Sequence, residues 1–312
     1  MHTIIKGVID VKKVMLLSIF ILLIAVIAGC KKNSVIQKRE TLSNGEENAY
    51  VKEDSSYEYV LTSRKEVIGR QGIAYNDDVF YVSSNSTLTS YNKNWQIING
   101  TETALDKIDL DVNHIGDIEV YNDEIYAGVE YFSGRVIKNP LIAVYDIHTF
   151  KLNRIYNIDP SSGQTEISGV TIDPKTNSIW ASSWIDGESS KYLYRYSLDT
   201  GKYLAKYELK NPPLCVQGIS YFDGYIYLTA DDSYDKADHI YRVKPDINKK
   251  VFDVELEKTL DGLNFVAELE GLTFDTRNRR LLLISNIDSQ LLSSSSYPNN
   301  IEMHEVFIYN IV

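Results

Sequence analysis

Gln71-Gly72-Ile73-Ala74-Tyr75 is the stretch that decides the fold, because four altered copies of it follow along the chain. The copies are Gly116-Asp117-Ile118-Glu119-Val120, Ser168-Gly169-Val170-Thr171-Ile172, Gln217-Gly218-Ile219-Ser220-Tyr221 and Glu270-Gly271-Leu272-Thr273-Phe274. Asp117 takes the glycine position in the second copy. Successive glycine positions are 45, 52, 49 and 53 residues apart, which is close to the length of one four-stranded propeller blade.

Each copy continues in the same way, with a turn and then two further strands. In the first copy Asn76-Asp77-Asp78 forms the turn, and asparagine and aspartate are typical of tight hairpins. Second strands are predicted at 79–82, 125–127, 179–181, 226–228 and 281–284, and third strands at 88–91, 142–146, 193–196, 240–243 and 306–309. A fourth, more variable strand is expected at the outer edge of each copy.

The two ends of the repeat region complement each other. The fifth copy stops at Val312 after its third strand, whereas the strand-like segment Tyr57–Leu61 precedes the first copy. We therefore expect an all-β fold, a β-propeller of five four-stranded blades in which this N-terminal strand closes the last blade and removes open sheet edges. Six blades would follow if residues 92–113 or 286–305 formed another sheet. A β-sandwich is the remaining alternative, although it does not explain the regular spacing.

The N-terminal residues form a targeting signal. Lys6, Lys12 and Lys13 precede an apolar run from Val14 to Ala28 that is too short to cross a bilayer comfortably but matches a secretory signal. Ile27-Ala28-Gly29-Cys30 resembles the bacterial lipobox. The resemblance implies cleavage before Cys30 and a lipid on its sulfur. An uncleaved N-terminal helix and a soluble secreted protein are the alternatives.

This interpretation divides the chain into three parts: a lipoprotein signal peptide (1–29), a charged flexible tether (30–54) and a propeller domain (55–312). The lipidated protein is expected on the cell membrane, on its extracytoplasmic face, as a monomer. Loss of residues 1–29 removes three lysines and Asp10, so the net charge falls from −11 to −13. That charge argues against a nucleic-acid partner. Cys215 is then the remaining free thiol, which excludes an internal disulfide.

In a propeller the residues just before each inner strand meet at one mouth of the central channel. The candidate ligand-binding residues are Gln71, His114, Asp117, Glu166, Trp184, Gln217, Glu268 and Glu270. Oxygen ligands suit Ca²⁺ or Mg²⁺, and the metal candidates are Asp117, Glu166, Glu268 and Asn286. His114 is the candidate general base. The alternative is that these polar residues only end the strands, and that Trp184 packs between blades.

Two resemblances bear on activity. Glu270-Gly271-Leu272-Thr273 resembles a repeat motif of plant-type glutaminyl cyclases, which are propellers. The acidic set resembles in chemistry the channel mouth of regucalcin-like and gluconolactonase-like propellers, which hold a divalent metal with Glu, Asn and Asp.

The leading hypothesis is a surface-anchored binding module that recognises a protein, a glycan or a small molecule, because the sequence carries no catalytic motif. A divalent-metal-dependent hydrolase or lactonase is the alternative, and a structural spacer in the cell envelope is a third hypothesis.

Overall fold

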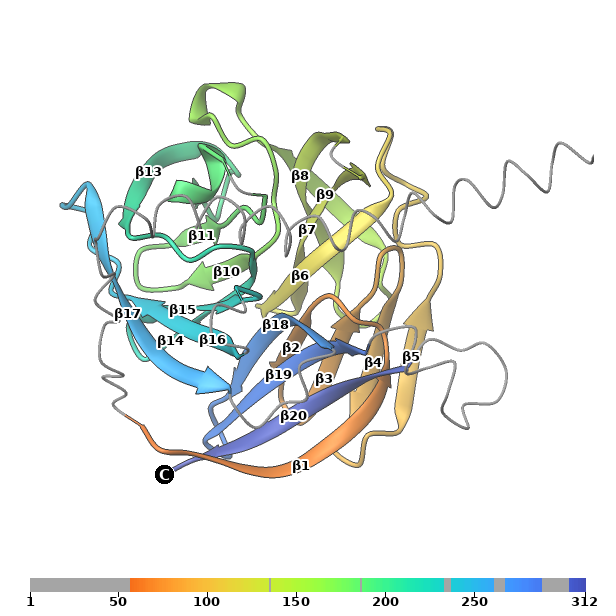
Figure 1. Ribbon diagram of the computed structural model, residues 1–312. Coiled ribbons are helices and arrows are strands. Elements are labelled where there is room, and N and C mark those ends of the chain that lie inside the picture. The colour runs from red at the N-terminus through yellow and green to blue at the C-terminus, as the bar shows by residue number, and fades with distance from the viewer. Residues whose placement is uncertain (1–56, 135, 186, 233–236, 261–266, 288–302) are drawn as a thin grey trace, which may run out of the picture. The chain divides into compact units, whose positions relative to one another are not determined.

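The computed structural model describes residues 57–134, 136–185, 187–232, 237–260, 267–287 and 303–312 (Figure 1). The signal peptide and the tether predicted from the sequence lie outside these residues. Twenty strands and two short 3₁₀ segments, Pro160–Ser162 and Ser189–Lys191, make up the regular structure of the described part. The fold is all-β, as expected.

The strands form three four-stranded sheets and one eight-stranded sheet. The first sheet contains β2 (Ile73–Asn76), β3 (Val79–Ser83), β4 (Leu88–Asn92) and β5 (Ile97–Thr101). The second contains β6 (His114–Tyr121), β7 (Glu124–Ser133), β8 (Val136–Asp146) and β9 (Leu152–Asn157). The eight-stranded sheet runs in the order β10 (Val170–Asp173), β11 (Ser178–Ala181), β12 (Tyr192–Ser197), β13 (Tyr203–Lys210), β17 (Val251–Leu260), β16 (Asp238–Val243), β15 (Tyr225–Ala230) and β14 (Val216–Phe222). The last sheet contains β18 (Ala267–Asp275), β19 (Arg280–Ile287), β20 (Met303–Ile311) and β1 (Tyr59–Ile68).

Tight hairpins connect the first two strands of each repeat, as the turn residues predicted. Asp77 and Asp78 have φ values of 45° and 66°, and Asn122 and Asp123 have values of 48° and 58°. These left-handed conformations match the right-handed twist of the flanking strands, and Asn and Asp tolerate them better than other non-glycine residues. All the predicted second and third strands are confirmed.

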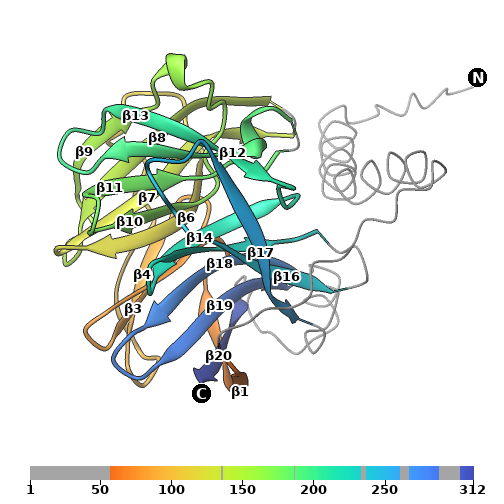
Figure 2. The same cartoon turned by 90° about the vertical axis from the view of Figure 1, so that its left-hand side faces the viewer.

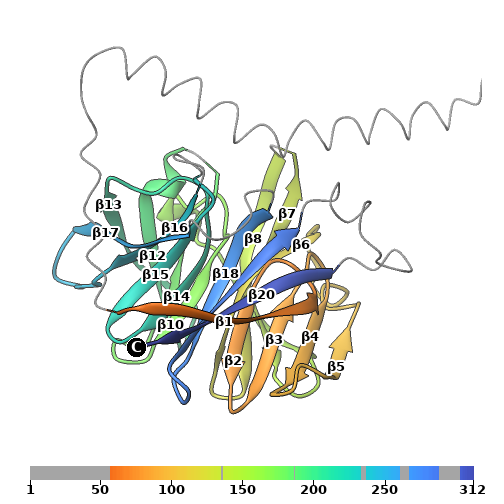
Figure 3. The same cartoon turned by 60° about the horizontal axis from the view of Figure 1, so that its bottom comes forward.

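The N-terminal strand joins the C-terminal sheet. β1 pairs antiparallel with β20, from Tyr59 opposite Ile311 to Ile68 opposite Met303 (Figure 3). The pairing expected for the segment Tyr57–Leu61 is therefore confirmed, and the strand is longer than predicted because its pairing continues past a bulge near Leu61. Figure 2 shows the same sheet from the side, with β19 between β18 and β20. Residues 92–113 supply β5 to the first sheet, whereas residues 288–302, the other place for a sixth blade, lie outside the described residues.

The innermost strands, β2, β6, β10, β14 and β18, lie next to one another around the centre of the domain (Figure 1). The N–H of Asp117 donates to the carbonyl of Ser168, and the N–H of Gly271 donates to the carbonyl of Gln71, both at 2.9 Å. A Cβ on Gly218 would lie 2.7 Å from the Cα of Gly271, and one on Gly271 would lie 2.8 Å from the Cα of Gly72. The repeated glycine is needed because the backbones of neighbouring inner strands touch at this level.

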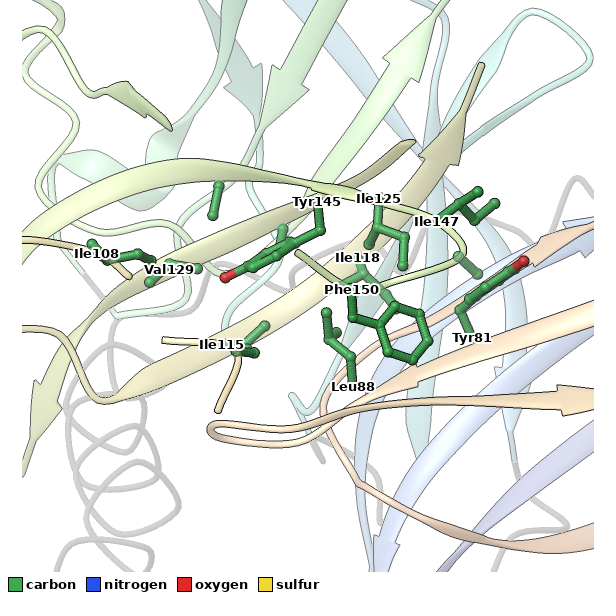
Figure 4. Close-up of a cluster of buried hydrophobic side chains, with 14 of the residues drawn as sticks. Tyr81, Leu88, Ile108, Ile115, Ile118, Ile125, Val129, Tyr145, Ile147 and Phe150 are labelled. Carbon is green, nitrogen blue, oxygen red and sulfur yellow. The ribbon is translucent and has the colours of Figure 1, made fainter. Parts of the chain in front are cut away.

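The hydrophobic core consists of five clusters, each of which spans two successive groups of four strands. In one of them Tyr81 and Leu88 of the first sheet pack against Ile118, Ile125 and Tyr145 of the second (Figure 4). Another unites the first sheet with the last, through Ile73 and Val82 on one side and Leu282 and Ile308 on the other. Because the last sheet packs against the first, the five clusters form a closed ring, as in a propeller-like fold. Two stacked sheets would instead share one core. The β-sandwich alternative is therefore wrong.

Candidate functional site

We call the side of the domain where the inner strands begin the start face, defined by Gln71, His114, Glu166, Gln217, Glu268 and Glu270. On this face the amide Nε2 of Gln217 donates to Oε1 of Glu268 at 2.7 Å, and that of Gln71 donates to Oε1 of Glu270 at 3.4 Å. These four side chains come from β14, from β18 and from the position two residues before β2. The structure thus brings together four predicted site residues that are far apart in the sequence.

Two further glutamates lie between the second sheet and β10. Oε2 of Glu130 accepts the N–H of Ile167 at 2.9 Å. Oε2 of Glu166 accepts the N–H groups of Trp184 at 2.6 Å and of Ile185 at 3.0 Å. Both glutamates are 2% exposed, so these hydrogen bonds replace the water that each carboxyl has lost. Glu166 therefore also holds the loop that carries Trp184.

Burial shifts the protonation of these carboxyls. It raises the pKa of Glu166 to about 7. The pKa of Glu130 is raised well above its usual value by burial and by the neighbouring Glu166. Burial, followed by Glu268, likewise raises the pKa of Glu270, although Arg70 acts in the opposite direction. Near neutral pH the start face therefore contains carboxyl groups that keep protons they would release in water.

His114 and Trp184 lie on the same side. His114 pairs with Glu130 across β6 and β7. Burial and the positive charge of Arg70 lower the pKa of its imidazole to about 4, so the ring is neutral at pH 7. The ring of Phe132 lies 5.7 Å from that of His114 and 6.0 Å, edge-on, from that of Trp184. Because Phe132 belongs to the second sheet, Trp184 packs against a neighbouring sheet. Packing between blades was the alternative to a ligand-binding role for this residue.

Asp117 is not on the open part of the start face. It is 1% exposed and lies on the central axis, where its carboxylate contacts the positions that a Cβ on Gly218 or Gly271 would occupy. Oδ2 accepts the N–H of Ile219 at 2.9 Å, whereas Oδ1 has no hydrogen-bond partner among the described residues. Burial raises the pKa of Asp117 well above its usual value. The alignment that put Asp117 in the glycine position agrees with this placement.

The four metal candidates do not share one environment. Glu268 lies opposite Asn286 in the β18–β19 pair, Asp117 is buried on the axis, and Glu166 is turned toward the backbone of Trp184. Among the residues that the structure describes, no group of three or more His, Cys, Asp or Glu side chains is placed to hold a metal ion. Binding of Ca²⁺ or Mg²⁺ stays a prediction.

The sequence analysis did not single out Arg70 or Glu119. Arg70 directly precedes Gln71, but it has no counterpart of the same charge in the other copies. Glu119 could have been found, because the aligned positions of the other copies hold Ala74, Thr171, Ser220 and Thr273, which are all uncharged. It lines a cavity of about 360 Å³ at the opposite end of the inner strands, which we call the end cavity.

Comparison with known proteins gives a likeness of fold only. No protein family matches the sequence, and no curated protein matches it. Among solved structures, a gluconolactonase from Xanthomonas campestris is similar with a TM-score of 0.45 and 10% identity, over 75% of this chain and 68% of that chain. Hydrazine synthase of Kuenenia stuttgartiensis is similar with a TM-score of 0.44 and 10% identity, over 83% of this chain and 66% of that chain. A search of the described residues for a helix long and apolar enough to cross a membrane finds none.

Proposed function

We propose that the domain is a binding module that holds a positively charged ligand on the start face. The observation that carries this proposal is the presence of two carboxyl pairs on this side of the domain, Glu130 with Glu166 and Glu268 with Glu270, in which three carboxyls have raised pKa values. Gathering buried carboxyls at the end of a sheet costs free energy, and apolar residues would close the fold more stably. Groups kept in such an unfavourable state are typical of binding and catalytic sites.

The ligand follows from the charge. A cation would stabilise the ionised carboxylates, whereas the same carboxylates would repel an anion of the same size. A protein segment rich in lysine, a polyamine or a divalent cation all provide this chemistry, and the negative charge of the whole chain attracts them to the surface.

The proposal is tested by the melting temperature of the chain without residues 1–29, carrying Cys30→Ser so that it stays soluble. Spermidine, calcium chloride and a neutral maltooligosaccharide serve as probes at matched ionic strength. Spermidine is expected to raise the melting temperature, because a ligand that binds the folded state alone stabilises it. The increase should be lost in Glu268→Gln and kept in Glu208→Gln, which changes an exposed glutamate of β13. Equal responses of the two variants, or a response to the neutral sugar alone, would contradict the proposal.

The metal-dependent hydrolase or lactonase is the second candidate, and the neutral imidazole of His114 favours it, since a neutral imidazole can accept a proton. An observation against the hydrolase is that each of four glutamates already has one carboxyl oxygen engaged in a hydrogen bond. They are Glu130, Glu166, Glu268 and Glu270. The same experiment separates the two functions. Saturable binding of one Ca²⁺ that is lost in both Glu166→Gln and Glu268→Gln would favour the hydrolase, and a response to spermidine without Ca²⁺ binding would favour the binding module.

The fold is proposed to be a five-bladed propeller. In this interpretation the eight-stranded sheet counts as two blades, β10–β13 and β14–β17, that are joined along their outermost strands. The five core clusters and the sequence of contacts between the inner strands support this count.

The chain is also proposed to be a lipoprotein that displays this domain, as a monomer, outside the cytoplasm. The lipobox Ile27-Ala28-Gly29-Cys30 supports this proposal. Metabolic labelling with a palmitate analogue in a bacterial host is expected to label the wild-type chain and to place it in the membrane fraction. Cys30→Ala should lose both the label and the membrane association, and Cys215→Ala should keep them. Label on the Cys30→Ala chain would refute lipidation at this residue.

A further inference from the structure

The end cavity lies where the inner strands finish, at the other end of the axis from the start face. All five inner strands contribute to its lining through their last residues or the turns that follow. Its volume of about 360 Å³ falls in the range of small-molecule sites, which begins at roughly 300 Å³. The two ends are separated by the level at which Asp117, Gly218 and Gly271 touch one another, so a molecule in the end cavity would not reach the start face.

A fixed carboxyl group lies in the lining of this cavity. Oε2 of Glu119 accepts the hydroxyl of Thr171 at 2.8 Å, and Oε1 accepts the N–H of Val120 at 2.9 Å. The hydroxyl oxygen of Thr171 in turn accepts the N–H of Tyr221 at 2.8 Å. Glu119 is therefore tied to both β10 and β14 and has a defined orientation before any ligand arrives, which lowers the entropy lost on binding.

The charge around Glu119 is uncompensated. The nearby Asp117 is also a carboxyl, and burial together with the ionised form of Glu119 raises its pKa. The cation in the lining is Arg277, but its guanidinium is paired with Asp77 at 2.9 Å and with Asp78 at 3.0 Å. Burial raises the pKa of Glu119 to about 7, so its carboxyl is partly ionised at neutral pH, and a cation in the cavity would favour the ionised form.

Four aromatic side chains contribute to the lining, beside small polar and aliphatic residues. Tyr75, Tyr121, Tyr221 and Phe274 come from four different inner strands. Phe274 is held by stacking on Phe222, with ring centroids 4.2 Å apart and planes within 5° of each other. The faces of aromatic rings attract cations, and several rings around one carboxylate are the usual way in which proteins bind alkylated ammonium groups. A bare metal ion would instead need several oxygen ligands, and no such group is found among the described residues.

We propose that the end cavity is a second binding site, specific for a small alkylammonium ion. Glu119 balances the charge of the ion, and the rings of Tyr75, Tyr121, Tyr221 and Phe274 pack against its methyl or methylene groups. The site is independent of the ligand proposed for the start face, because the contacts on the axis keep the two ends apart.

The experiment uses the chain without residues 1–29, carrying Cys30→Ser, and tetramethylammonium as the probe. Its neutral control is tert-butanol, which has nearly the same shape without the charge. In amide NMR spectra tetramethylammonium is expected to shift the signals of Val120 and Tyr221 in a saturable way, with at least tenfold weaker binding in Glu119→Gln. Glu208→Gln and the start-face variant Glu268→Gln should bind as the wild type does. If Glu119→Gln does not fold, Tyr121→Leu provides the second variant, with binding expected to weaken at least threefold.

Two results would overturn the inference. The first is that tert-butanol shifts the same signals with equal affinity, since the site would then recognise shape and not charge. The second is that Glu119→Gln, or Tyr121→Leu in its place, keeps the wild-type affinity. Loss of spermidine binding at the start face in Glu268→Gln, with tetramethylammonium binding unchanged, would confirm that the two sites are separate.

Discussion

Asp117 stands where the other four copies have glycine, and its side chain fills the space at the axis that a ring of glycines would leave open. The carboxylate caps the N–H of Ile219 and lies close to Gly218 and Gly271. A single departure from the repeat thus closes the centre of the domain. It also leaves one buried carboxyl oxygen without a hydrogen bond among the described residues, which costs free energy.

At this packed level a methyl group is expected to be destabilising. In Gly271→Ala the new Cβ would lie 2.7 Å from Oδ1 of Asp117 and 2.8 Å from the Cα of Gly72. Because a backbone atom cannot move aside as a side chain does, we expect a loss of about 2–4 kcal/mol in the free energy of unfolding, near the upper part of the range for overpacking. Urea denaturation monitored by tryptophan fluorescence measures it.

Gly100→Ala is the matched control, since a Cβ there would have its nearest neighbour at an ordinary 3.6 Å. Its change should stay within about 0.5 kcal/mol, as is usual for a surface substitution. A loss in Gly271→Ala no larger than that of the control would show that the inner strands are not in close contact.

The sequence predicted single residues better when they belonged to the repeat than when they differed from it. Gln71, Gln217 and Glu270 were found because each directly precedes the glycine position of its copy, and Glu268 because it lies three residues before that position. They meet as two pairs, Gln71 with Glu270 and Gln217 with Glu268. Arg70 and Glu119 were not, because one copy alone carries each charge. The Glu166 carboxyl turns toward the loop after β11. Its direction depends on the conformation of residues 184 and 185 and has no signal in the sequence.

Among the elements, β1 has the largest separation in sequence from its partner strand. Besides its pairing with β20, the hydroxyl of Tyr59 donates to Oε1 of Glu257 on β17 at 2.5 Å. Oε2 of Glu257, which is fully buried, is 2.9 Å from Nη1 of Arg242. The first strand of the domain is therefore attached to the last sheet and also to β17 of the eight-stranded sheet.

Tyr59→Phe removes this attachment while leaving the ring in place. We expect a loss of about 1–3 kcal/mol in the free energy of unfolding, because the buried Glu257 carboxylate loses a hydrogen bond. Differential scanning calorimetry should show a lower melting temperature with no change in cooperativity. Tyr203→Phe is the control, since the hydroxyl of Tyr203 makes no hydrogen bond in the part of the chain that the structure describes. A melting temperature equal to that of the control would contradict the role given to Tyr59.

At the scale of elements the sequence predicted the hairpins and the place of the N-terminal strand. The hairpins follow from Asn and Asp turns and alternating apolar residues, and the use of the N-terminal strand follows from the missing fourth strand of the last copy. The parallel pairing of β13 with β17 was not predicted. It joins residues 208–210 to residues 251–253, and nothing in either segment specifies a partner that belongs to a different repeat.

For the molecule as a whole, the buried carboxyls make stability depend on pH. Glu119 and Glu166 have pKa values of about 7 in the folded state against 4.5 for an ordinary glutamate. The folded protein thus binds more protons than the unfolded chain between these values. The stability that the protonated groups contribute is fully present below about pH 4.5 and is lost as the pH rises through 7. The pKa values of Glu124 and Asp275 are lowered, so their contribution is lost only at more acidic pH.

We therefore expect the free energy of unfolding to fall between pH 5.5 and pH 8.5. Within this window a folded-state pKa of about 7 corresponds to a fall of about 2 kcal/mol per group. Glu166→Gln should reduce the fall by about 2 kcal/mol, because the amide oxygen can still accept the N–H groups of Trp184 and Ile185 but cannot ionise. Urea denaturation at several pH values provides the measurement. A stability that rises with pH in this range would show that these carboxyls are ionised in the native protein.

The parallel contact between β13 and β17 also has a dynamic consequence. Besides its backbone pairing it includes the stacked rings of Tyr207 and Phe252, with centroids 4.7 Å apart, and the ion pair of Lys210 with Asp253 at 3.1 Å. Local unfolding should therefore not begin at the β13–β17 contact. It should begin at edge strands such as β5 and β9, whose outer backbone groups pair with no further strand of their sheets. In deuterium exchange the amides at this contact are expected to exchange slowly, so that the eight-stranded sheet moves as one rigid unit.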